Sequence, residues 1–246
     1  MQKTIKVGAV SYLNTKPLMY AFKHGLQING MEITEEYPAK IAKMLLDDEI
    51  DVGLVPVAII PKLKEYYIIS DYCIGAESAV ASVCLFSEVP LEKIEKVILD
   101  YQSKTSVALA RVLIQHYWKL QVVFEEAKEN FREEIKGTTA AVVIGDRAFE
   151  QRQISPYIYD LADAWIKFTE LPFVFAAWVA NKQLPEDFII KFNEANKEGL
   201  GNIDAVVAEN NSPFYDLRTY YTKNISYVLT EDKRKGLDKF LSFLRE

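Results

Sequence analysis

Two apolar stretches decide the fold: VASVCLF at residues 80–86 and PFVFAAWVA at residues 172–180. Each has the length and composition of a buried strand. About ninety residues with their own strands and helices lie between them. A middle domain inserted into an outer one explains this order with only two crossings. We therefore expect two lobes with a ligand cleft between them: residues 1–86 and 175–246 form lobe I, and residues 87–174 form the inserted lobe II.

Around these stretches, short apolar runs alternate with amphipathic segments, the pattern of an α/β fold. We expect strands at residues 5–10, 31–36, 51–55, 97–99, 121–124 and 140–144, helices after Pro17, Pro38 and Pro56 and over 103–120 and 146–152, and a mostly helical segment from 185 to 246. In open α/β sheets, ligands bind at the carboxyl ends of strands, where helix N-termini point. The turns between strands and helices are therefore the candidate site.

Composition narrows the function classes. The chain has 246 residues, a formal charge of −6 and a pI of about 5.2, which argues against a nucleic-acid partner. No apolar stretch reaches the roughly 20 residues of a membrane helix. The N-terminal stretch turns polar at Ser11, too early for a secretory signal, so we expect a cytoplasmic protein. Cys73 and Cys84 have apolar neighbours and are expected to be buried free thiols.

The first candidate turn follows the strand at residues 5–10 and offers Ser11, Asn14 and Thr15. These side chains, with the free backbone N–H groups of the next helix, could hold an anion. The alternative is that Asn14 or Thr15 merely caps that helix.

The second turn carries Ser103, Thr105 and Ser106 around Lys104. Three hydroxyl groups and a lysine at a helix N-terminus suit a carboxylate or a phosphate. The alternative makes Ser103 an N-cap and leaves the other side chains on the surface.

Two further positions complete the set. Gly145 ends a strand and permits close backbone approach, and Asp146 after it could cap a helix, orient a substrate hydroxyl or act as an acid or base. Ser82 lies in the first apolar stretch, where it is either a satisfied buried hydroxyl or part of the cleft floor.

Other chemistry has little support. The chain lacks the glycine-rich phosphate and dinucleotide motifs and the nucleophile elbow of hydrolases. Its only histidines are His24 and His116, too few for zinc-type spacing. We expect neither a metal nor a cofactor, and the sequence leaves the oligomeric state open.

The first turn belongs to VGAVSYLNTKPL, residues 7–18, which resembles the N-terminal signature of the chorismate dehydratase family, whose reaction opens the futalosine route to menaquinone. Four further segments follow in the family's order: DVGLVP at 51–56, SKTS at 103–106, IGD at 144–146 and LPFVFA at 171–176. The resemblance extends to about residue 180. The family is similar in fold to type II periplasmic solute-binding proteins, which implies the same inserted lobe.

This resemblance implies the loss of water from chorismate to give 3-[(1-carboxyvinyl)oxy]benzoate. Asn14, Ser82 and Asp146 are then the expected catalytic residues. Ser11, Thr15, Ser103, Thr105, Ser106 and Gly145 are the expected substrate-binding residues. Either Asp146 or the substrate's own enolpyruvyl carboxylate, as proposed for the family, removes the ring proton.

Two other functions stay open at this point. A non-catalytic binder of small anions would share the fold and its polar helix N-termini. The related 1,4-dihydroxy-6-naphthoate synthase is less similar, because its catalysis needs a second-lobe histidine and the only one here is His116 in mid-helix. One position departs from the family: Glu170 stands where a glycine is usual. If that glycine serves a tight turn, the local hinge geometry should differ.

Overall fold

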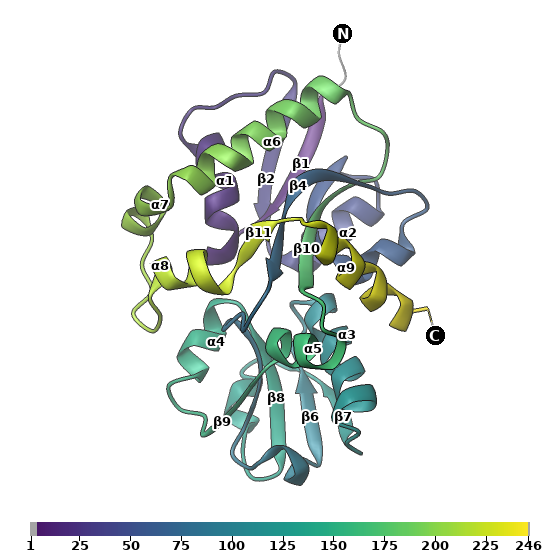
Figure 1. Cartoon of the computed structure of the whole chain (residues 1–246), viewed down its shortest axis with the longest axis vertical. Helices are drawn as coiled ribbons and strands as arrows, with labels where there is room; N and C mark the ends of the chain where they lie inside the picture. Colours follow the sequence, from purple (N-terminus) through teal and green to yellow (C-terminus); the bar gives the residue numbers. More distant parts are fainter. Residues whose placement is uncertain (1–3, 246) are drawn as a thin grey trace.

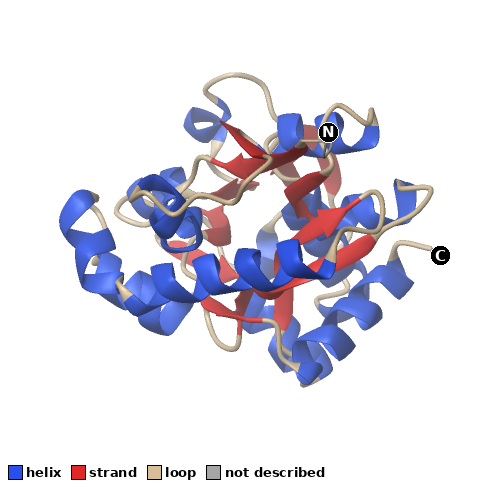
Figure 2. Ribbon diagram, turned by 90° about the horizontal axis from the view of Figure 1, so that it is seen from above, coloured by secondary structure: helices blue, strands red, loops and turns tan. Residues whose placement is uncertain are grey.

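The computed structural model describes residues 4–245, which form two lobes, one above the other in Figure 1. Lobe I has a six-stranded sheet in the order β11-β4-β10-β3-β1-β2, and lobe II has a five-stranded sheet in the order β7-β6-β8-β5-β9. The strands lie inside and the helices surround them (Figure 2). The chain is thus the α/β fold with an inserted lobe that the two apolar stretches predict.

The elements of lobe I are β1 (Ile5–Val10), η1 (Leu13–Thr15), α1 (Lys16–Lys23), β2 (Met31–Glu36), α2 (Pro38–Leu46), β3 (Val52–Pro56), η2 (Val57–Lys62), β4 (Tyr67–Ala76), β10 (Phe173–Ala180), α6 (Glu186–Gly201), α7 (Ile203–Glu209), α8 (Leu217–Thr219), η6 (Tyr220–Asn224), β11 (Ser226–Val228) and α9 (Glu231–Phe243). Those of lobe II are β5 (Val83–Ser87), η3 (Leu91–Lys93), β6 (Lys96–Leu99), α3 (Lys104–Val112), η4 (Leu113–Tyr117), β7 (Val123–Glu126), η5 (Phe131–Glu134), β8 (Thr139–Ile144), α4 (Asp146–Gln151), β9 (Tyr157–Asp160) and α5 (Leu161–Thr169).

Parallel pairing brings the candidate turns together. β1 runs parallel to β2 and β3, and β6 runs parallel to β7 and β8. The turns after β1, β6 and β8 therefore lie at the carboxyl edges of their sheets, which is where such sheets bind ligands.

The hydrogen bonds of β5 and β10 place the crossings between the lobes. Within residues 4–245, β5 pairs only with β8 and β9, and β10 pairs only with β3 and β4. The expected limits at residues 86 and 175 fall inside these two strands. We therefore propose that residues 77–82 and 170–172 connect the lobes, since each strand belongs with the sheet to which it is hydrogen-bonded.

Some elements differ from the sequence-based expectation. The helix expected over 103–120 is α-helical only to Val112 and continues as the π-helix η4. The long strand β4 was not expected, because its pairing with β10 shifts register twice and blurs the alternation of apolar residues. The short strand β11 interrupts a region expected to be helical.

Both cysteines are free and buried, as expected. Within residues 4–245, no helix combines the length and apolar character needed to cross a membrane.

Candidate active site

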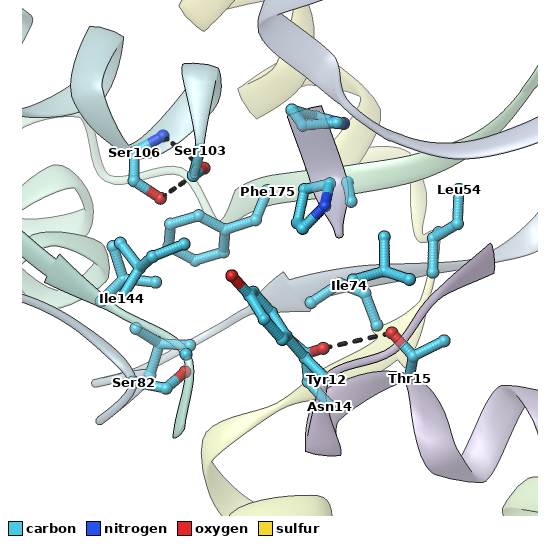
Figure 3. Close-up of a pocket in the computed structure, with 17 residues that line it drawn as sticks. Tyr12, Asn14, Thr15, Leu54, Ile74, Ser82, Ser103, Ser106, Ile144 and Phe175 are labelled. Atoms are coloured by element: carbon cyan, nitrogen blue, oxygen red, sulfur yellow. Dashed lines mark hydrogen bonds between the residues drawn. The ribbon is translucent and has the colours of Figure 1, made fainter. Parts of the chain in front are cut away.

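A cavity of about 50 Å³ lies between the lobes (Figure 3). Lobe I contributes Val10, Tyr12, Asn14, Thr15, Pro38, Leu54, Pro56, Ile74, Phe175 and Ala176, the first connecting segment contributes Val80 and Ser82, and lobe II contributes Val83, Ser103, Ser106, Ile144 and Gly145. The apolar walls come from the strands, and the polar groups come from the turns that follow them.

Six of the nine residues expected in the site line this one cavity: Asn14, Thr15, Ser82, Ser103, Ser106 and Gly145. Ser11, Thr105 and Asp146 do not line it. Ser11 is exposed at the end of β1, where its backbone N–H donates to the carbonyl of Glu36.

The start of α3 forms one polar end of the cavity. Ser103 is the N-cap, and its Oγ accepts the backbone N–H of Ser106 at 3.2 Å and lies 3.0 Å from the Ser106 hydroxyl. Thr105 and Ser106 are buried, so the alternative that leaves them on the surface is wrong, although its N-cap at Ser103 is confirmed. The Thr105 hydroxyl accepts the backbone N–H of Ala58 at 3.1 Å and joins the two lobes.

The turn after β1 forms the opposite end. Neither η1 nor α1 has a side-chain cap, so the capping alternative for Asn14 and Thr15 is wrong. The Thr15 hydroxyl donates to Asn14 Oδ1 at 3.2 Å (Figure 3), and the Tyr227 hydroxyl donates to the Asn14 carbonyl at 2.9 Å. The Asn14 backbone and its amide oxygen are thereby held, and the side chain faces the cavity.

Ser82 and Gly145 meet on the floor of the cavity. The Gly145 N–H donates to the Ser82 carbonyl at 2.8 Å. Gly145 has a φ of +63°, and a Cβ added there would lie 3.2 Å from the ring of Tyr12. Glycine is therefore required both for the backbone conformation and for the close approach of Tyr12.

Asp146 lies beside the cavity as the first residue of α4. The N-cap of this helix is Gly145, and no side chain caps it. The alternative in which Asp146 caps the helix is therefore wrong. Burial raises the pKa of its carboxyl group, opposed by the backbone N–H of Leu13 and the charges of Lys16 and Arg147.

Sequence reasoning missed a polar network that also crosses the cleft. The Tyr12 hydroxyl donates to Gln102 Oε1, which also accepts from Arg147 Nη2 at 2.9 Å. Arg147 Nη2 lies 2.9 and 2.7 Å from the two carboxylate oxygens of Asp100, which is 1% exposed. Asp100 and Gln102 directly precede the Ser103 turn, and Tyr12 lies within the first motif. Their places in the sequence pointed to the site, but only the fold pairs them.

The cavity wall is almost free of ionisable groups. Among the described residues that line it, only Tyr12 can ionise, and burial raises the pKa of its hydroxyl. A bound anion would therefore rely on neutral donors and on the N-terminus of α3. Within residues 4–245, no three His, Cys, Asp or Glu side chains are grouped as they would be to hold a metal ion.

An inserted lobe and a polar cavity at helix N-termini define a two-lobed protein of the periplasmic-binding-protein fold. The structure aligns with protein AF1704 of Archaeoglobus fulgidus at a TM-score of 0.73 and 14% identity, covering 98% of this chain and 97% of that one. It aligns with the periplasmic aliphatic sulphonate binding protein SsuA of Escherichia coli at a TM-score of 0.63 and 13% identity, covering 98% and 93%. These likenesses show the fold.

Comparison of the sequence with protein families narrows the identification further than the fold does. The model of the menaquinone biosynthesis family matches residues 5–246, and this chain belongs to that family. A relative from Thermus thermophilus, a chorismate dehydratase, is 28% identical, and the match covers 97% of this chain and 94% of the relative.

Proposed function

We propose that this protein is a chorismate dehydratase, a lyase that converts chorismate to 3-[(1-carboxyvinyl)oxy]benzoate and water in menaquinone biosynthesis. The family and the full-length relative support this function. The observation that carries it is the convergence of Asn14, Thr15, Ser82, Ser103 and Ser106 on one cavity between the lobes.

The two ends of the cavity suit a substrate with two carboxylates. Ser103, Ser106 and the start of α3 would bind one carboxylate. Asn14 and Thr15 would bind the other, or the hydroxyl on ring carbon C4, while Ser82 donates from the floor. Ser11 and Thr105 would not contact the substrate, because neither lines the cavity.

The reaction needs charge stabilisation more than a strong base. The proton on ring carbon C3 is vinylogous to the ring carboxylate, so its electrons delocalise into that carboxylate. Expulsion of the C4 hydroxide then makes the ring aromatic. Neutral donors held in place, such as Asn14 and Ser82, stabilise the charge that grows during these steps.

The low ionisable content of the wall favours the substrate's own enolpyruvyl carboxylate as the base, since Tyr12 keeps its proton. A cleft that holds this carboxylate near C3 supplies the required proximity. Asp146 is the protein alternative, with a carboxyl group beside the cavity. Under the substrate-base mechanism, Asp146→Asn retains turnover. Under the Asp146 mechanism, the same variant binds chorismate but loses turnover.

Substrate entry requires the cleft to widen. The cavity of about 50 Å³ is far below the roughly 300–1,000 Å³ of pockets that enclose small-molecule ligands. We propose that the lobes separate about residues 77–82 and 170–172, which breaks the hydrogen bond from Tyr12 to Gln102. Two-lobed binding proteins close around their ligands in this way.

The test is to incubate the purified protein with chorismate, without added cofactor or metal, and to follow the products by chromatography and mass spectrometry. We expect the loss of one water to give the enolpyruvyl benzoate. Asn14→Ala, purified in parallel, should be about a hundred- to a thousand-fold slower, the usual cost of losing one such donor. Equal turnover by that variant would attribute the activity to a contaminant or to another site.

Folded protein that binds chorismate without converting it would instead support the anion-binding function. The naphthoate-forming function has no counterpart in this cavity, since His116 is exposed on η4 and its ring contacts Phe243. We also propose a cytoplasmic location, supported by the two free, buried thiols.

A further inference from the structure

Tyr220, in the C-terminal part of the chain, does not line the cavity but contacts Ser82, which does. Its hydroxyl donates to Ser82 Oγ at 2.8 Å, and the Tyr220 and Ser82 side chains are 0% and 1% exposed. The Asn14 side chain lies close enough to the same hydroxyl to lower its pKa. Tyr220 is therefore hydrogen-bonded to Ser82 and lies beside Asn14, the two residues to which we assign the stabilisation of charge.

The directions of these hydrogen bonds follow from the groups involved. Asn14 Oδ1 accepts from Thr15, which leaves the Asn14 NH₂ group, a group that can only donate, for other partners. The single proton of the Tyr220 hydroxyl goes to Ser82 Oγ. Since the Ser82 oxygen accepts this proton, the proton of Ser82 is left to be donated towards the cavity that Ser82 lines.

The ring of Tyr220 is held firmly enough for this task. It packs edge-on against Phe149 of α4 at 4.9 Å between centroids and against Tyr215 at 6.2 Å. Tyr220 also begins the π-helix η6, a type of distortion that recurs at functional sites. Burial raises the pKa of its hydroxyl, so Tyr220 stays protonated and remains a donor at physiological pH.

We propose that Tyr220 is a positioning residue: its hydroxyl holds the Ser82 hydroxyl as a donor into the cavity, beside the Asn14 amide. This inference rests on the proposed function for its effect on rate. Its structural part, the hydrogen bond from Tyr220 to Ser82, does not depend on the identity of the substrate.

The neighbouring residue supplies a matched control. Tyr221 lies in the same π-helix and is 2% exposed, but its buried hydroxyl has no hydrogen-bond partner among the described residues. Both Tyr220→Phe and Tyr221→Phe remove a buried tyrosine hydroxyl. Only Tyr220→Phe thereby removes a hydrogen bond.

The kinetic experiment measures kcat and KM for chorismate in both variants, in Ser82→Ala and in the double variant Ser82→Ala/Tyr220→Phe. We expect Tyr220→Phe to lower kcat about tenfold with KM within about threefold, as for the loss of one hydrogen bond. Tyr221→Phe should match the wild type. In the Ser82→Ala background, Tyr220→Phe should cost less than about threefold, because contacting residues are not additive.

The pH profile separates positioning from acid–base catalysis. A positioning role lowers kcat by the same factor from about pH 6 to pH 9, whereas loss of an acid or base removes a limb of the profile. The proposal is overturned if Tyr220→Phe behaves like Tyr221→Phe, if its tenfold loss persists in full without Ser82, or if a limb disappears.

A second measurement does not need turnover. The side-chain amide NMR signals of Asn14, identified by their loss in Asn14→Ala, should shift in Tyr220→Phe and stay in place in Tyr221→Phe. Unshifted signals in Tyr220→Phe would overturn the positioning role even in an active enzyme. Shifted signals in a protein that never converts chorismate would reject the proposed function and retain the hydrogen-bonded arrangement.

Discussion

The two segments that connect the lobes share an unusual backbone feature but use it differently. Residues 77–82 contain Ala81 with a φ of +66°, and residues 170–172 contain Glu170 with a φ of +60°. Residues other than glycine rarely adopt this left-handed conformation. Ala81 is buried and directly precedes Ser82 of the cavity, whereas Glu170 is exposed and follows α5.

The contacts around each residue explain the difference. Asp160 accepts the backbone N–H groups of Val80 at 3.1 Å and Ala81 at 2.7 Å, while it also caps α5. Glu170 donates its own N–H to the carbonyl of Ile166, as a residue that ends a helix does. In the first segment the strained conformation is held by a buried carboxylate and directly precedes Ser82, which lines the cavity. In the second segment it ends a helix.

The resemblance to the family predicts a glycine at residue 170. Glu170 takes the left-handed conformation that glycine adopts without strain. Glu170 can thus form such a turn at the second connecting segment, at the cost of local backbone strain.

The largest expected effect is that of removing the cavity-lining serine side chain of the first segment. Ser82→Ala should lower kcat about a hundred- to a thousand-fold, because a donor fixed in a water-poor site is lost. Steady-state kinetics measure this, with urea unfolding to show that the loss exceeds any change in stability. Ser78→Ala, an exposed serine of the same segment, should keep wild-type kinetics. A Ser82→Ala variant within about threefold of wild type would make Ser82 merely structural.

The next largest effect is expected when the carboxylate of Asp160, which holds the first segment, is removed. Asp160→Asn replaces an acceptor of several backbone N–H groups by an amide whose NH₂ opposes them. We expect a loss of about 2–3 kcal/mol in the free energy of unfolding, measured in urea. Asp163→Asn is the control: its partner Lys167 is exposed, so the loss should stay below about 1 kcal/mol. Equal losses in the two variants would contradict the special role of Asp160.

A smaller effect of the opposite sign is expected at the second segment. Glu170→Gly should raise the free energy of unfolding by about 0.5–1 kcal/mol, because glycine carries no Cβ penalty at this φ. Thermal unfolding measures the change, and kcat should stay at its wild-type value. A destabilised variant would mean that the Glu170 side chain contributes more than its backbone strain costs.

The smallest effect on stability is expected for the same change in the first segment. Both substitutions relieve backbone strain and add backbone freedom to the unfolded chain, but Ala81→Gly also removes a buried methyl group. These contributions nearly cancel in Ala81→Gly, so the free energy of unfolding should change by less than about 0.5 kcal/mol. A gain as large as that of Glu170→Gly would show that the two segments do not differ in how they are packed.

The sequence by itself determined the class of fold, the order of most elements and the turns that carry the site. Hydrophobic periodicity and glycine, proline and hydroxyl residues at strand ends are local signals, so they can be read without the fold. β1 and β2 lie where the periodicity predicts them, and the polar turns after β1, β6 and β8 meet at the cavity.

Only the tertiary structure decided which distant groups pair. The contacts of Tyr12 with Gln102, Asp160 with Ala81 and Tyr220 with Ser82 join residues 79 to 138 positions apart. No local propensity encodes such pairs, because each arises only after two separately folded segments pack together. The sequence therefore named the donors of the cavity, and the packing of the lobes decided in which direction each donor points.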